Sequence, residues 1–225
     1  MKKMRKWIAA IAFVLGLSLF APALLPIAGN AAVVEAANDK TKVKQTIKNF
    51  FKYAKTMNTK KMKSYVDSNC KEKVDSIAPT SALKAFMKKR NKSLSYSVKK
   101  VKASGGKATV KVKCRYLNSQ NAYSKMMEDI LTWIAAEAMA GRDYSNYSEA
   151  EIVKMIDEVI KKSFADNPNA YDNKYKSKTF TIQLKKVNGK WKISQIDKNL
   201  MDAVSSNYQS GMKEYLKSVR NAYGY

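Results

Sequence analysis

Hydrophobic residues recur every three or four positions in three successive stretches of the chain. This spacing is typical of amphipathic helices that turn one side towards a core. The first predicted helix covers residues 42–57, and Asn58 or Thr59 then caps a second helix that carries Val66. A third, short helix is expected to begin after Ser81.

Strict alternation of apolar and polar residues predicts two β-hairpins. In the first hairpin, residues 94–116, the even-numbered positions face a core and residues 104–106 form the turn. In the second hairpin, residues 180–193, the pair Asn188-Gly189 is the strongest short turn signal. The two hairpins predict an antiparallel sheet, and together with the helices they predict an α+β fold.

Two further helices are predicted between the hairpins, in a segment from about residue 119 to about residue 173. The second of them begins at Ser148, and Glu151 three residues later completes a capping-box pattern. A last helix, at about residues 199–223, carries one continuous apolar stripe. The expected order is therefore three helices, a hairpin, two helices, a hairpin and a final helix.

The segment of residues 1–36 has the layout of a secretory signal peptide. A basic start at residues 1–6 precedes an apolar run at residues 7–27, and small side chains favour cleavage between Ala36 and Ala37. An uncleaved membrane anchor is the alternative, because the apolar run is nearly long enough to span a bilayer. We expect a secreted or cell-envelope protein whose mature part, residues 37–225, is one domain.

Two stretches of the chain resemble a known superfamily. They are "KNFFKYAKTMNTKKMKSYVDS" at residues 48–68 and "KKVNGKWKISQID" at residues 185–197. With the leading helices and paired hairpins, they resemble the nuclear transport factor two-like superfamily, the SnoaL and ketosteroid-isomerase cone. More narrowly, they resemble its secreted bacterial members of unknown function. The resemblance covers residues 41–118 and 174–197, whereas the helical pair at 119–173 and the long final helix depart from the minimal pattern.

The resemblance implies a curved antiparallel sheet of two long hairpins packed on N-terminal helices. The inserted helical pair and the C-terminal helix would be additions to it. Such a cone often encloses an apolar pocket. Some relatives are isomerases or cyclases that use Asp, Tyr or His there, and many others bind ligands or partners without catalysis.

Three aromatic residues are the candidates for lining such a pocket. Tyr96 and Tyr116 share the inward parity of the first hairpin, and Trp191 has that of the second. An ordinary aromatic core is the favoured alternative, because large aromatic side chains most often fill the interior.

Acid–base chemistry has few candidate residues. No predicted strand turns an Asp or Glu inward, and Asp197 could equally cap the final helix. We expect Asp67 to be solvated at a helix end and Glu137 to lie at the exposed edge of an apolar stripe. The chain has no histidine, which excludes Ser-His-Asp and Cys-His catalysis and removes the commonest zinc ligand. We therefore expect no catalytic residue, no cofactor and no metal site.

Cys70 and Cys114 are the two cysteines of the chain. An exported protein with an even number of cysteines permits a disulfide between them. Cys114 has an inward strand position and Cys70 lies near a helix end, so a bridge requires those elements to meet. The alternative for Cys114 is a buried free thiol that packs as a small hydrophobic group.

Charge is distributed unevenly along the chain, which has 43 Lys and Arg against 18 Asp and Glu, a net charge of +25. Cleavage after Ala36 would leave a net charge of +22. The segment 119–173 holds ten acids and five bases, so the rest of the mature chain carries +27. Outward positions of the second strand predict a basic row on one sheet face, which the second hairpin extends. The row consists of Lys107, Lys111, Lys113 and Arg115, and its extension of Lys185, Lys190 and Lys192.

A charge of this size exceeds what solubility requires and predicts binding to polyanions by counterion release. We expect an exported, non-enzymatic domain that uses one basic side to associate with anionic cell-wall or membrane-surface polymers, or with a protein partner. Sequence-specific binding of nucleic acid is not expected, since no recognition-helix motif is present. The alternative function is small-molecule binding, or isomerase-like or cyclase-like catalysis, in an apolar pocket inside the cone.

The acidic helical pair bears on self-association. Two like-charged basic faces would repel each other, so we do not expect them to pair directly. We expect the acidic pair to cover part of the basic face instead, in the same chain or in a neighbouring one.

Overall fold

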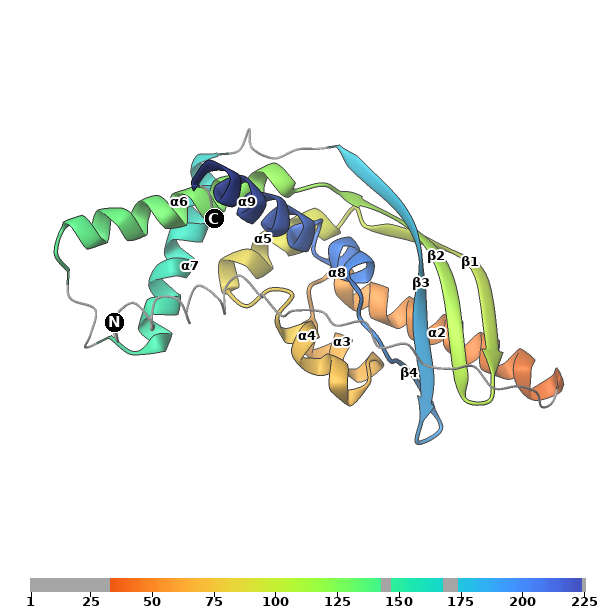
Figure 1. Cartoon of the computed structure of the whole chain (residues 1–225). Helices are drawn as coiled ribbons and strands as arrows, with labels where there is room; N and C mark the ends of the chain where they lie inside the picture. Colours follow the sequence, from red (N-terminus) through yellow and green to blue (C-terminus); the bar gives the residue numbers. More distant parts are fainter. Residues whose placement is uncertain (1–32, 143–146, 168–173, 224–225) are drawn as a thin grey trace.

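The computed structural model describes residues 33–142, 147–167 and 174–223 (Figure 1). In these ranges eight α-helices and a four-stranded antiparallel sheet form the expected α+β fold. The first half contains α2 (Val33–Lys55), α3 (Thr59–Met62), α4 (Lys71–Asp75), α5 (Ser81–Asn91), β1 (Ser95–Ser104) and β2 (Lys107–Leu117). The second half contains α6 (Gln120–Met139), α7 (Glu149–Asp166), β3 (Tyr175–Val187), β4 (Lys190–Ile193), α8 (Lys198–Val204) and α9 (Tyr208–Tyr223).

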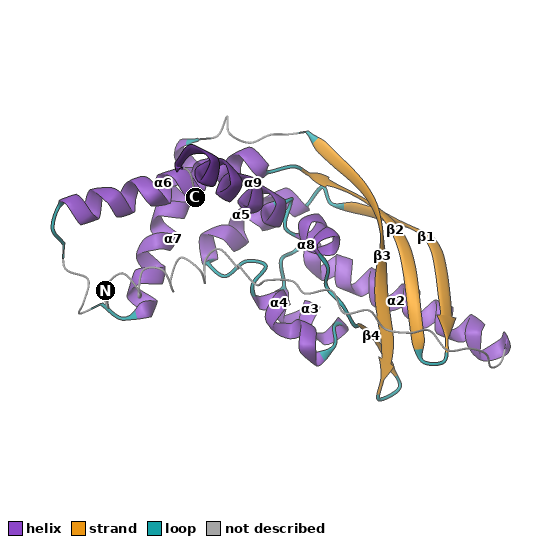
Figure 2. Cartoon of the chain, in the orientation of Figure 1, coloured by secondary structure: helices purple, strands orange, loops and turns teal. Residues whose placement is uncertain are grey.

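The sheet is curved and has the strand order β1-β2-β3-β4, so each strand pairs with its neighbour in the sequence. Helices α2, α5 and α8 pack against one face, which we call the inner face (Figure 2). Apolar side chains from α2 and from the inner face of β2 form the centre of the core. They include Ile47, Phe50, Phe51, Val110 and Val112, all fully buried. No described helix covers the opposite face, which we call the outer face.

A bulge in β1 changes the expected parity of the first hairpin. The register between β1 and β2 shifts between Val98 and Lys100, so that Val101 pairs with Val110. Beyond the bulge the odd-numbered residues of β1 face inward, and the expectation that all even positions do so is wrong for this part of the strand. The extra residue moves Lys100 to the outer face, beside Lys111.

The turn of the second hairpin is formed as the Asn-Gly pair predicts. Asn188 and Gly189 both have positive φ angles, of 48° and 73°, which matches the twist of a two-residue hairpin loop. β4 has four residues and ends at Ile193. Beyond it, Val66 adds an isolated parallel bridge to Ile193 and so extends the edge of the sheet.

The second predicted helix is much shorter than expected. The Asn58 side chain caps α3 by accepting a hydrogen bond from the Lys61 backbone N–H, as the sequence indicated. The chain then forms a 3-10 turn at Lys63–Tyr65 and becomes extended at Val66, where it meets the sheet edge. A second 3-10 turn, Ser68–Cys70, and α4 follow, and neither was predicted.

The final helix is divided in two. Asp197 caps α8, its Oδ1 atom accepting from the Leu200 N–H at 2.8 Å. The chain leaves the helical conformation at Ser206 and Asn207, whose φ angles are 54° and 73°, and α9 starts afresh at Tyr208. The apolar stripe continues across the break, which explains why its spacing indicated one helix.

The inserted helices form as predicted, including the capping box of Ser148 and Glu151 on α7. They pack on α5 and α9 and lie at the end of the molecule that is remote from the outer face (Figure 1). Within one chain the acidic pair therefore does not cover the basic face, contrary to that part of the expectation.

The expected signal peptide lies outside the described residues, except for residues 33–36 in the first turn of α2. Within the described ranges, no helix combines the length and apolar character needed to cross a membrane.

Candidate anion-binding surfaces

The outer face of the sheet is basic and lacks acids. None of the four strands contains an aspartate or a glutamate. The outward positions of β1 and β2 hold exposed basic side chains interspersed with serine and threonine. These basic residues are Lys100, Lys102, Lys107, Lys111, Lys113 and Arg115.

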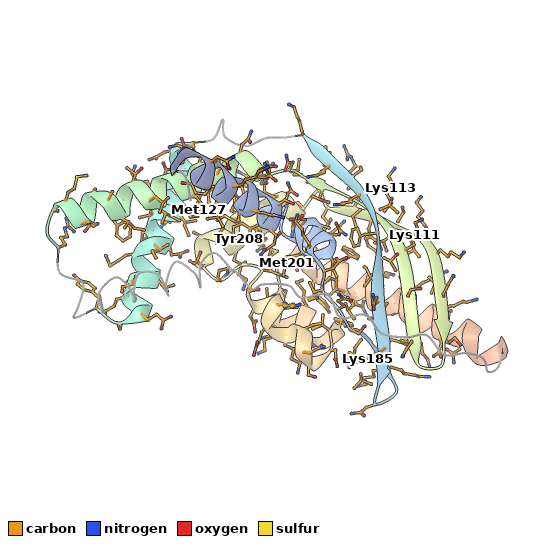
Figure 3. The ribbon with its side chains drawn as sticks, viewed as in Figure 1. Lys111, Lys113, Met127, Lys185, Met201 and Tyr208 are labelled. Carbon is orange, nitrogen blue, oxygen red and sulfur yellow. The ribbon has the colours of Figure 1, made fainter. Side chains whose placement is uncertain are left out.

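The structure confirms that the predicted row on β2 is exposed and shares one face. Lys111 and Lys113 lie on the side of the sheet turned away from the helices (Figure 3). The guanidinium of Arg115 stacks over the Tyr175 ring at 3.3 Å from its centroid, which holds that end of the row in place. Sequence reasoning missed Lys100 and Lys102. The sequence did contain a signal for them, because the apolar residues of β1 change from even to odd positions, which indicates a bulge.

The three lysines predicted to extend the row differ from it in how their ammonium groups are bonded. The Lys185 ammonium lies 2.6 Å from Oδ2 of Asp67, so its charge is neutralised. The Lys192 ammonium donates a hydrogen bond to the backbone carbonyl of Ser64 and is half-buried. Lys190 is exposed on the hairpin turn. Only Lys190 of the three therefore presents a free, exposed ammonium.

Asp67 is buried, so the expectation of a solvated helix end is wrong. Its backbone N–H donates to the Ile193 carbonyl at 2.8 Å, which holds this segment on the sheet edge. The hydrogen bond from Lys185 is the main cause that holds the pKa of Asp67 below its usual value. Asp67 is thus an ionised structural carboxylate.

A groove of about 1220 Å³ lies beside the β3–β4 hairpin. The middle of α2, residues 63–68, α4 and the hairpin line it. Most of its lining residues are polar and lysine is the commonest of them, and Tyr65 and Trp191 add aromatic surface. The lining includes Lys42, Gln45, Asn49, Ser64, Tyr65, Ser68, Lys71, Lys190, Trp191 and Lys192.

Lys71, Lys190 and Lys192 all line this groove. Burial, followed by the charges of Lys190 and Lys71, lowers the pKa of Lys192. A carboxylate also lines the groove at Asp75, but the Lys63 ammonium pairs with it at 2.8 Å. Glu72 is the groove's remaining exposed carboxylate. Unpaired positive charge therefore predominates. Sequence reasoning could not find this site because three separate segments, residues 42–49, 63–75 and 187–192, form it.

The three aromatic pocket candidates do not line this groove together. The Tyr96 ring stacks on Phe51 with centroids 4.3 Å apart, and Tyr116 is 1% exposed. Trp191 is buried, donates from Nε1 to Asp39 at 3.0 Å and borders the polar groove. Tyr96 and Tyr116 do not line that groove.

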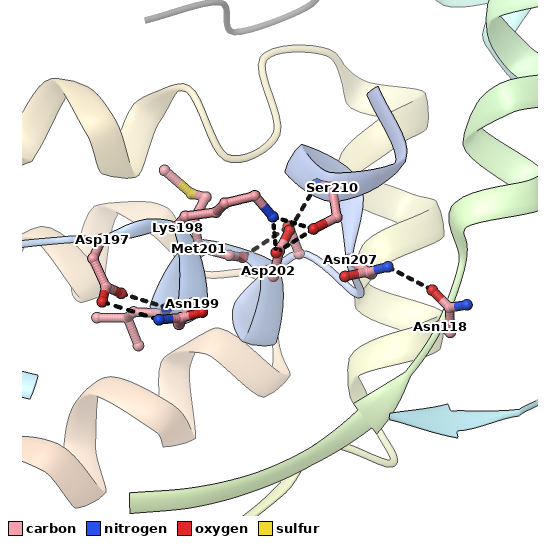
Figure 4. A network of polar contacts seen from close by, with 10 residues as sticks. Asn118, Asp197, Lys198, Asn199, Met201, Asp202, Asn207 and Ser210 are labelled. Atoms are coloured by element: carbon pink, nitrogen blue, oxygen red, sulfur yellow. Dashed lines mark hydrogen bonds and ion pairs between the residues drawn. The ribbon is translucent and has the colours of Figure 1, made fainter. Parts of the chain in front are cut away.

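One buried carboxylate was missed altogether. Asp202 on α8 accepts hydrogen bonds from the Lys198 ammonium at 2.8 Å and from the Ser210 backbone and hydroxyl (Figure 4). It therefore connects α8 with the first turn of α9 across the break. Glu137, expected to be exposed, has a side chain only 12% exposed and lies 3.2 Å from Nε of Arg142.

Cys70 and Cys114 are both free and buried in this structure, so the permitted disulfide is not formed in it. The Cys70 thiol donates to the Ser194 carbonyl at 3.4 Å, at the sheet edge. Burial raises the pKa of Cys114 to about 12. Both thiols are therefore protonated packing groups.

Lysines also occupy the solvent side of the helices. Lys44 and Lys48 on α2, and Lys84 and Lys88 on α5, are exposed. The basic residues are therefore spread over more than one side of the molecule, contrary to the expectation of a single basic side.

We found no match to a known family, to a characterised protein or to a solved structure. The superfamily resemblance therefore stays a prediction.

Proposed function

We propose that this chain is an exported, non-enzymatic binding domain that associates with anionic polymers of the cell envelope through its outer face. The observation that supports the proposal most is the sheet without acids, four of whose outward lysines lie side by side on β1 and β2. These are Lys100, Lys102, Lys111 and Lys113.

The geometry favours an extended partner. Adjacent strands lie about 4.8 Å apart and outward residues of one strand about 6.8 Å apart, so the ammonium groups form a two-dimensional array. Lys100 and Lys111 are directly paired across the strands, and their like charges destabilise the sheet locally. A polyanion that neutralises several of them at once releases counterions and relieves this repulsion.

Retention of the protein on immobilised long-chain polyphosphate tests the proposal. The test variant replaces the four outward lysines by glutamine. The control variant makes the same change at Lys44, Lys48, Lys84 and Lys88, which removes the same charge from the helices.

Each lost phosphate contact lowers the slope of log affinity against log salt by about 0.7–0.9. The outer-face variant should therefore lose about 3 from this slope and elute at much lower salt, while the control keeps a slope close to that of the parent. Equal losses in the two variants would show that net charge alone, and not the outer face, causes retention.

A further inference from the structure

We propose that the groove beside the β3–β4 hairpin is a specific site for a phosphate group carried by a sugar or polyol. This site is separate from the outer face and does not depend on the proposed function. It combines clustered ammonium groups with neutral hydrogen-bonding side chains in one concave surface.

The phosphate would be held by Lys71, Lys190 and Lys192. Lys71 comes from α4 and the other two come from β4, directly after the hairpin turn, and all three line the groove. Lys192 is already anchored, because its ammonium donates to the Ser64 carbonyl, and so it needs little reordering to meet an anion. An anion between these groups would offset their mutual repulsion.

The chemistry of the side chains favours phosphate over carboxylate. A phosphate monoester carries about −1.5 to −2 charge at pH 7 and has three acceptor oxygens, whereas a carboxylate carries a single negative charge and has two oxygens. A cluster of ammonium point charges therefore binds the phosphate more strongly. The cations of the groove lining are all lysines. Asp67 and Asp75 are each paired with a lysine, so neither leaves an uncompensated negative charge in the groove.

The rest of the groove fits a hydroxyl-rich carrier. Amide and hydroxyl groups of Gln45, Asn49 and Ser68 also line the groove and can bond to hydroxyls. The volume of about 1220 Å³ exceeds the range of about 300–1,000 Å³ that is usual for small-molecule sites. The groove therefore has room for more than one phosphate-linked unit.

Titration with glycerol 3-phosphate, poly(glycerol phosphate) and glucuronate at fixed ionic strength tests the proposal. The readouts are calorimetry and the NMR signal of the indole N–H of Trp191, a residue that lines the groove. We expect saturable binding of both phosphates, a shift of this signal, and at least tenfold weaker binding of glucuronate. Tighter binding of the polymer per phosphate would identify a repeating polymer as the ligand, and equal binding would identify a free phosphorylated polyol.

The test variant is Lys71→Gln with Lys190→Gln, since both side chains are exposed and their loss should leave the fold intact. The control is Lys111→Gln with Lys113→Gln on the outer face. The groove variant should weaken binding of glycerol 3-phosphate at least tenfold, and the control less than twofold. Equal effects of the two variants, or an absence of saturable binding, would overturn the proposal. Retention on polyphosphate is measured separately, so failure of the groove is distinguishable from failure of the outer face.

Discussion

Replacing Asn91 by alanine should destabilise the protein strongly, although the residue belongs to neither candidate surface. Asn91 is the last residue of α5 and is fully buried. Its amide donates to the backbone carbonyls of Ala54 and Val204, and its Oδ1 accepts from the Ser206 hydroxyl at 2.9 Å. One side chain thus joins α2, α5 and the break between α8 and α9.

The expected cost follows from the groups that the substitution leaves without a partner. The Ala54 carbonyl still accepts from the Met57 N–H, but the Val204 carbonyl and the Ser206 hydroxyl lose the Asn91 side chain in a buried site. Each unsatisfied buried group costs about 1–3 kcal/mol, so we expect a loss of about 3 kcal/mol. In a protein of this size that corresponds to a Tm about 6–12 °C lower.

Thermal unfolding followed by circular dichroism measures this shift. The matched control is Asn121→Ala, because Asn121 is exposed on α6 and its loss should change stability by less than about 0.5 kcal/mol. If Asn91→Ala melted within 2 °C of the parent, the Asn91 bonds could not be what holds the α8–α9 break in place.

Three further predictions concern the turn at Gly189, the two thiols and the ion pair of Asp67 with Lys185. Gly189→Ala should cost about 1 kcal/mol in urea unfolding, because φ is +73° there; an unchanged midpoint would contradict the positive-φ turn. Mass spectrometry after alkylation at pH 8 should find no adduct on Cys70 or Cys114 in the native protein and two in denaturant, since both thiols are buried; rapid native labelling would be inconsistent with this packing. The hydrogen bond from Lys185 lowers the pKa of Asp67, so its stabilisation is complete above about pH 4 and lost as pH falls through the lower folded-state pKa. Urea unfolding between pH 5 and 2 should therefore show a smaller acid-induced loss in Asp67→Asn, and identical pH profiles would refute the assignment.

Regular periodicity was sufficient to predict the hairpins and the inserted helices. These elements bury one side against the core, so the apolar positions repeat with the period of the element itself. The capping box at Ser148 and the turn at Asn188 are local in the same sense, because residues a few positions apart make all the contacts.

Where periodicity gave a wrong prediction, contacts between residues far apart in the sequence determine the structure. Nothing next to Asp67 in the sequence indicates that Lys185 will neutralise it, since the two lie on segments that meet only at the sheet edge. The break at Ser206 preserves the apolar stripe, and Asn91 on another helix stabilises it. The bulge in β1 was visible in the parity of its apolar residues, but a single extra residue is easily taken for irregular alternation.

The ion pair between the buried Asp67 and the partly exposed Lys185 separates the two candidate surfaces. The register aligns Lys107, Lys185 and Lys192 across the strands, so that a continuous basic track from the outer face to the groove would pass through Lys185. Asp67 neutralises this middle position, and the track is interrupted there. A polyanion on the outer face therefore gains nothing at short range from the groove lysines. For this reason the outer face and the groove should contribute independently to binding, and their substitutions should have additive effects.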